Sequence, residues 1–145
     1  MTELRDPVAR DCFREHASLN QQLARMEKLV RAPDPAGADA LREQLRDLRD
    51  VLSRHMASEE KPDGFMDQVR RRTARYDAAL KELRDEHRSL STGLDTLIAE
   101  AADFEEVPGP FASRLRSWSD TLRDHESREN HLLQAAFTVD LGAKD

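Results

Sequence analysis

The sequence predicts an all-α protein: an up-down-up-down antiparallel four-helix bundle built from two repeated helical hairpins. Three observations favour this class. Only 5% of the 145 residues are aromatic while 36% are charged, which is typical of helices with charged outer faces. Leucines recur every three or four residues over long stretches, which is the spacing of one helix face. A pattern of histidines and glutamates also occurs twice, once in each half of the chain.

Proline and glycine clusters mark where the helices begin and end. Asp6 followed by Pro7 predicts the first start, because aspartate caps free backbone N–H groups and proline fits the first helical position. The stretches 31–37, 61–64 and 104–110 interrupt helices, and Gly142 is a stop signal. Because the connections are short, neighbouring helices should run antiparallel. We expect one domain over residues 1–145, with helices at roughly 7–30, 38–60, 73–102 and 110–138 and a short helical turn at 65–71.

Charge and hydropathy argue against several classes of protein. The formal net charge is −6, whereas nucleic-acid-binding domains are basic. No apolar run approaches the roughly 20 residues that span a bilayer, and residues 1–10 lack the apolar stretch of a signal peptide. The single cysteine, Cys12, cannot form an internal disulfide and fits a reducing compartment. We therefore expect a cytoplasmic protein without nucleic-acid or membrane partners, in which Cys12 is a small buried hydrophobic residue. The sequence identifies no protein partner.

Four histidines and two glutamates fall on the apolar stripes of the predicted helices, in steps of three or four residues from the leucines. A buried carboxylate needs a cation. No lysine or arginine lies on the stripes, which leaves protonated histidine or a metal ion. Histidines and carboxylates from facing helices are how bundle cores hold metals. The candidate metal ligands are His16, His55, Glu59, His87, His125 and Glu129.

The candidate ligands repeat between the halves of the chain. His87 follows His16 by 71 residues, and the two HxxxE pairs that begin at His55 and His125 are 70 residues apart. In each half the lone histidine lies a similar distance before its connection as the histidine of the HxxxE pair lies after it, so at about 1.5 Å per residue both reach nearly the same layer. Residues i and i+4 share a helix face, so each HxxxE pair can bind one metal ion or bridge to a second.

Four fragments carry these residues: EHASL at 15–19, HMASEE at 55–60, DEHRSL at 85–90 and HESREN at 125–130. Together they resemble the hemerythrin-like, or HHE cation-binding, family, over about residues 16–133. The resemblance implies a left-twisted four-helix bundle with a non-haem di-iron centre. The centre would hold two iron ions per chain, bridged by two carboxylates and an oxo or hydroxo group, with zinc as a less favoured substitute. The implied roles are binding or sensing of oxygen, nitric oxide or peroxide, and iron handling.

The sequence departs from the oxygen carriers of this family in two places. The carriers have a second histidine one turn after the lone histidine of the third helix, where this chain has Ser91, and Asn20 is the counterpart in the first half. They also have an aspartate five residues after the histidine of the fourth helix. Here that residue is Asn130, and the carboxylate, Glu129, comes at four. Two histidines per iron and an open position favour redox or peroxide chemistry, sensing or metal storage over reversible oxygen carriage.

Other polar residues near the stripes are interpreted as peripheral. Glu15 and Glu86 precede core histidines and are interpreted as surface charges, and Glu60 as a solvated neighbour of Glu59, with an outer hydrogen bond to a ligand as the alternative. His131 lies off the stripe and is interpreted as peripheral rather than as a seventh ligand.

We expect a binding protein rather than an enzyme, and two other functions remain open. One is a di-iron oxidase or peroxidase, and the other is an interaction module whose metal, such as zinc, is only structural. A ferritin-like site is disfavoured because it needs ExxH pairs, and none of the five histidines has a glutamate three residues before it.

Overall fold

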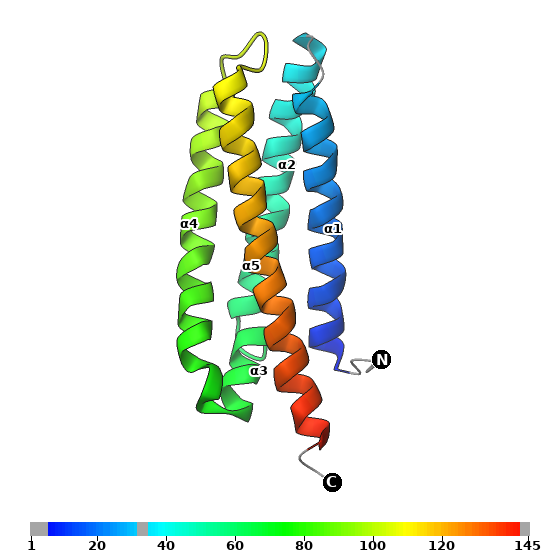
Figure 1. Cartoon of the computed structure of the whole chain (residues 1–145), viewed down its shortest axis with the longest axis vertical. Helices are drawn as coiled ribbons and strands as arrows, with labels where there is room; N and C mark the ends of the chain where they lie inside the picture. Colours follow the sequence, from blue (N-terminus) through cyan, green and yellow to red (C-terminus); the bar gives the residue numbers. More distant parts are fainter. Residues whose placement is uncertain (1–5, 32–34, 143–145) are drawn as a thin grey trace.

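Four long helices form the protein, shown in Figure 1 as a computed structural model that describes residues 6–31 and 35–142. Successive long helices run in opposite directions, and no strand occurs in these residues. The predicted antiparallel four-helix bundle is therefore confirmed. The bounds are α1 Pro7–Val30, α2 Pro35–Glu60, α3 Phe65–Arg72, η1 (a 3-10 turn) Ala74–Tyr76, α4 Asp77–Ala101 and α5 Gly109–Gly142.

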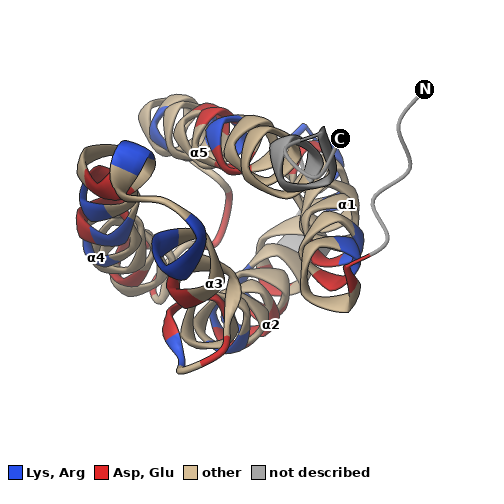
Figure 2. Ribbon diagram, turned by 90° about the horizontal axis from the view of Figure 1, so that it is seen from below, with Lys and Arg blue, Asp and Glu red and all other residues tan. Residues whose placement is uncertain are grey.

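The long helices form a closed ring around one core. Each contacts two neighbours, in the order α1, α2, α4, α5 and back to α1, as the view from below shows in Figure 2. The short helix α3 lies at one end of the ring and contacts α1, α2 and α5. This closed arrangement lets four helices each contribute side chains to one interior layer.

The first helix begins as its sequence signal predicts. The carboxylate Oδ1 of Asp6 accepts hydrogen bonds from the backbone N–H groups of Val8, at 2.9 Å, and Ala9, at 3.2 Å. Pro7 occupies the first helical position, where its missing N–H costs nothing. Capping and proline therefore define where α1 begins.

Some helix bounds differ from those predicted. The third long helix begins at Asp77 rather than at 73, because Thr73 is extended (φ −165°, ψ 142°) and its hydroxyl accepts a hydrogen bond from the backbone N–H of Arg75. Helix α2 begins at Pro35 rather than at 38, since the first helical turn tolerates proline. Helix α5 continues past 138 to the stop signal at Gly142.

Two apolar clusters fill the bundle on either side of a polar layer. The larger cluster joins all four long helices through residues such as Leu23, Leu45, Leu94 and Leu115. The smaller one lies at the end of the ring where α3 packs, and α3 contributes its apolar face to it. The polar layer between the clusters is thereby closed from both ends. The side chains that α3 contributes are Phe65, Met66 and Val69.

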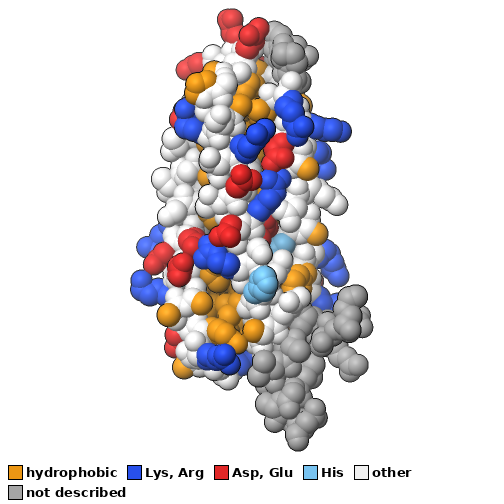
Figure 3. All heavy atoms as spheres, viewed as in Figure 1, with side chains coloured by type: hydrophobic (Ala, Val, Ile, Leu, Met, Phe, Trp, Pro, Cys, Tyr) orange, Lys and Arg blue, Asp and Glu red, His pale blue; other side chains and the backbone are white. Residues whose placement is uncertain are grey.

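On the face shown in Figure 3, charged side chains of both signs are spread over the surface, and an apolar patch lies near the lower end. A surface hollow between α4 and α5 is lined partly by Tyr76, Leu83, His131 and Leu132.

Among the residues that the structure describes, no helix is long and apolar enough to cross a membrane.

Candidate metal centre

The polar layer brings together all six residues that the sequence singled out. Each of the four long helices contributes one histidine, and α2 and α5 each add a glutamate one turn further along. None of the six is more than 4% exposed. The four histidines lie in one layer, because their ring nitrogens gather around the same two carboxylates. The six are His16 on α1, His55 and Glu59 on α2, His87 on α4, and His125 and Glu129 on α5.

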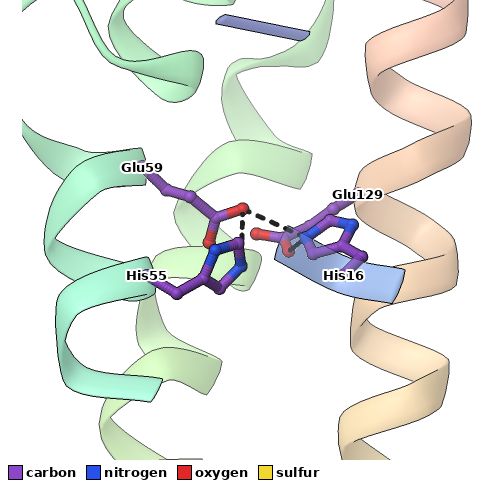
Figure 4. Close-up of side chains that lie close together, drawn as sticks. All are labelled: His16, His55, Glu59 and Glu129. Atoms are coloured by element: carbon purple, nitrogen blue, oxygen red, sulfur yellow. Dashed lines mark ion pairs between the residues drawn. The ribbon is translucent and has the colours of Figure 1, made fainter. Parts of the chain in front are cut away.

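Glu59 lies between the two pairs of histidines. Its Oε2 atom lies 3.4 Å from Nε2 of His16 and 3.3 Å from Nε2 of His55. Its other oxygen, Oε1, lies 3.1 Å from Nε2 of His87. One carboxylate therefore presents a separate oxygen to each half of the layer. Figure 4 shows Glu59 meeting the His16–His55 pair, with Glu129 opposite.

Glu129 bridges in the same way from the other side. Its Oε1 lies 3.1 Å from Nε2 of His16, and its Oε2 lies 3.2 Å from Nε2 of His125 and 3.4 Å from Nε2 of His87. The potential ligand atoms form two groups, each within 4.8 Å, that share both carboxylates. The groups are His16, His55, Glu59 and Glu129, and His87, His125, Glu59 and Glu129.

The geometry of these contacts fits metal ions better than direct hydrogen bonds. Nε2 of His16, His55 and His125 and Oε1 of both glutamates are buried without a hydrogen-bond partner among the described residues, although they lie close to one another. Two ligand atoms that each lie about 2.1 Å from one ion, at angles of 90–110°, are roughly 3.0–3.4 Å apart. The observed spacings of 3.1–3.4 Å fall in this range.

Each histidine is oriented by a hydrogen bond on its outer nitrogen. Nδ1 of His55 lies 2.6 Å from Oε1 of Glu15, and Nδ1 of His125 lies 2.7 Å from Oε1 of Glu86. A carboxylate accepts hydrogen bonds, so Nδ1–H is the donor and Nε2 presents its lone pair to the centre. A carboxylate behind a ligating histidine also raises its basicity.

The other two histidines are oriented from the opposite hairpin. Nδ1 of His87 on α4 lies 2.6 Å from Oε2 of Glu60 on α2. Nδ1 of His16 on α1 lies 2.7 Å from Oδ1 of Asn130 on α5. Each hairpin thus holds one histidine of the other in place, and a shift of either hairpin would move ligands of both groups.

These contacts correct three interpretations made from the sequence. Glu15 and Glu86 are not simple surface charges, and Glu60 is more than a solvated neighbour of Glu59, because each binds a histidine of the layer. Their backbone positions lie beside the core stripe, but a glutamate side chain is long enough to reach back to the ring nitrogen. His131, in contrast, is exposed and outside both ligand groups, in agreement with its peripheral interpretation.

The layer is strongly attractive to cations. Burial lowers the pKa of His16, but contacts with Glu129 and Glu59 outweigh burial and raise it to about 11. Burial also lowers the pKa of His55, but Glu15 and Glu59 raise it to about 9. For His87, Glu129 and Glu59 outweigh burial and raise the pKa to about 10. Burial raises the pKa of both glutamates, yet the histidines hold it below its ordinary value. Protons and metal ions therefore compete for the same histidine and carboxylate groups.

Comparison with known families adds a second, independent observation. The family model of the hemerythrin HHE cation-binding domain matches residues 8–137. The chain belongs to this family. No match is found among curated proteins or among solved structures. In this hemerythrin-family protein the buried histidine and glutamate groups fit a metal site, and the resemblance carried by the four sequence fragments is confirmed.

The positions where this hemerythrin-family chain departs from the oxygen carriers add no ligand to the layer. The hydroxyl of Ser91 lies 3.6 Å from Sδ of Met56, to which it donates. Asn20 is exposed. Asn130 binds the outer nitrogen of His16 instead of pointing between the histidines. Each ligand group therefore contains two histidines and two shared carboxylates.

Two further residues lie in or beside the layer, and the sequence did not predict this position for either of them. Glu126 is only 2% exposed. It follows Leu122 by four residues and precedes Leu133 by seven, so a stripe drawn one position wider would have included it. Cys12 is buried, as expected, but its Sγ also lies 3.9 Å from Oε2 of Glu59.

Proposed function

We propose that the protein binds two iron ions and uses them to bind or sense oxygen, nitric oxide or peroxide, or to handle iron. One ion would lie between His16 and His55 and the other between His87 and His125. The observation that carries the proposal is that both buried carboxylates present oxygens to both histidine pairs. Two carboxylates shared in this way suit a pair of ions rather than a single one.

The donor types favour iron. Imidazole suits iron, zinc, copper and nickel, and a site of two histidines with carboxylate oxygens and open positions is typical of non-haem iron. A structural zinc site is tetrahedral and closed by four protein ligands. Four donors per ion would leave iron, which accepts more ligands, with room for a small molecule.

The oxygen carriers of the family have a second histidine one turn after the lone histidine of the third helix. Its absence here supports a role other than reversible oxygen transport. Ser91 stands at that position and donates to Met56 instead of facing the ions. Both ions would then have the same number of histidine ligands, so more than one open position would remain. Stable, reversible oxygen binding by the reduced protein would contradict this part of the proposal.

Elemental analysis with an optical spectrum tests the proposal. Protein produced with added iron should contain about two iron ions per chain and show charge-transfer bands in the near ultraviolet. His55→Ala combined with Glu59→Ala should lose both, while His131→Ala, which removes an exposed histidine, should lose neither. Stoichiometric zinc without visible bands would overturn the iron proposal in favour of a structural metal.

An enzymatic role is the second candidate, because open positions on a redox-active ion permit turnover as well as binding. A di-iron oxidase or peroxidase would consume peroxide at a rate proportional to bound iron. Steady-state peroxide assays on iron-loaded and chelated protein separate the two functions. Stoichiometric spectral changes without turnover favour binding or sensing.

A further inference from the structure

The two halves of the metal centre differ in what surrounds them. The interval of 70 or 71 residues that relates the ligands also pairs their neighbours, and three of the pairs that lie close to the ligand side chains differ in chemistry. In each pair, one member lies beside a residue of the His16–His55 ligand group. The pairs are Cys12 with Leu83, Met56 with Glu126, and Glu60 with Asn130.

Glu126 is the largest difference. Its side chain is buried, and neither carboxylate oxygen has a hydrogen-bond partner among the described residues. On α5, Asn130 contacts Nδ1 of His16 on α1 at 2.7 Å, and Arg123 pairs with Glu27 on α1 at 2.7 Å. Glu126 lies three residues after Arg123 and four before Asn130, so it shares the face of α5 that is turned toward α1. Glu126 therefore lies on the His16–His55 side. A buried carboxylate without a partner is unfavourable, so it requires a cation or a hydrogen-bond donor.

The counterpart of Glu126 beside the other group is apolar. Met56 is 6% exposed, and its Sδ accepts the hydrogen bond from Ser91. Cys12 adds to the contrast, because its Sγ lies 3.9 Å from Oε2 of Glu59, the oxygen that faces His16 and His55. Leu83, which corresponds to Cys12, is an apolar residue of the smaller cluster.

We propose that Glu126 is a third carboxylate of the centre and serves only the ion between His16 and His55. It is not among the four side chains whose ligand atoms gather there, so it acts on that ion from outside the ligand group, through its charge and as a hydrogen-bond acceptor. The two metal positions are therefore inequivalent. The His16–His55 position binds a divalent ion more tightly.

This inference rests on the proposed two-metal function, and metal titration tests it without any activity assay. Chelated full-length protein is titrated with Co²⁺ in a calorimeter under anaerobic conditions. Glu126→Met copies the residue on the other side, Glu126→Gln keeps a hydrogen-bond acceptor, and Met56→Leu is the matched control. Circular dichroism confirms that each variant is folded.

The wild type should bind two ions with different affinities. Glu126→Met should weaken one binding step by about 10–100-fold, which is typical for loss of an outer partner of a metal ligand, and leave the other unchanged. Glu126→Gln should lose less than Glu126→Met, and Met56→Leu should alter neither step.

Single-site backgrounds identify the ion concerned. With His125→Ala the intact histidine pair is His16–His55, and adding Glu126→Met should weaken binding there. With His55→Ala the intact pair is His87–His125, and Glu126→Met should have no effect. Two ions bound with equal weakening of both steps, or with none, would overturn the inference alone. Fewer than two ions in the wild type would overturn the two-metal function and this inference with it.

Discussion

Nδ1 of His87 lies 2.6 Å from Oε2 of Glu60, and this contact joins α4 of the second hairpin to α2 of the first. Its counterpart is the 2.7 Å contact between His16 and Asn130, which joins α1 to α5. The orientation of each of these histidines therefore depends on how the two hairpins pack. The geometry of the centre therefore depends on the packing of all four helices, because displacement of either hairpin changes both ligand groups.

Removing the partner of His87 should weaken metal binding. Glu60→Ala leaves the ring nitrogen without its acceptor, and we expect metal affinity to fall by about 10–100-fold. Glu60→Gln should retain most of the affinity, because Asn130 shows that an amide oxygen serves in the corresponding position. Calorimetric titration with Co²⁺ measures both variants. Glu43→Ala, at an exposed position on α2, is the control, and equal affinities for Glu60→Ala and the control would contradict the role.

Chelation should make the stability of the protein depend on pH. The pKa values of His16, His87 and His55 are raised to about 11, 10 and 9, so protonated histidines stabilise the folded state. That contribution is complete below the unfolded value of about 6.5 and is lost as pH rises through about 9 to 11. Chelated protein should therefore lose stability from pH 6.5 upward.

Metal loading should remove this loss, since ligating histidines are deprotonated and metal binding strengthens as pH rises. Thermal unfolding of chelated and metal-loaded protein between pH 6.5 and 9.5 measures the difference. The two curves should diverge with increasing pH. Parallel curves would show that these histidines contribute nothing to the pH dependence.

Glu126→Met should stabilise the metal-free protein even as it weakens metal binding. Burial raises the pKa of Glu126 to about 7, so its charged form destabilises the folded state increasingly as pH rises from about 4.5 to 7. Removing an unsatisfied buried polar group should gain about 1–3 kcal/mol, with a larger gain at pH 8 than at pH 5. Urea unfolding with a chelator at both values tests this. A loss of stability would mean that Glu126 has a partner within the protein.

Gly64 should be required for the turn after α2. A Cβ atom there would clash with the carbonyl oxygen of Ser58 and lie 2.9 Å from that of Lys61. Because backbone must move to relieve the clash, Gly64→Ala should destabilise the protein by about 1–3 kcal/mol. It should also weaken metal binding, since the turn directly follows Glu59 and Glu60. Gly109→Ala is the control, as its Cβ would meet nothing within 4 Å; equal urea midpoints would contradict the prediction.

Periodicity explains why the six central residues could be predicted. A helix repeats every 3.6 residues, so steps of three and four assign a residue such as His87 to the inward face. The constant rise per residue then places His16 and His55 at one height across a short connection. Neither inference requires knowledge of side-chain conformation.

Side-chain reach explains what the sequence did not reveal. Glu15 and Glu86 lie beside the stripe, and only the packed structure shows their carboxylates turning back to the outer nitrogens of His55 and His125. Helix α4 begins at Asp77, later than predicted, because Thr73 takes an extended conformation and caps a local turn. Periodicity contains no information about either feature.

The fold class, the layer and the repeat thus follow from the order of residues, because helical periodicity and short connections leave few alternatives. The packing of the two hairpins against each other decided the rest. It directs Glu59 and Glu129 between both histidine pairs, joins Glu60 to His87, and buries Glu126 on the side of α5 that faces α1. These relationships join residues on different helices, and the distances between side chains on separate helices are determined only when the core closes.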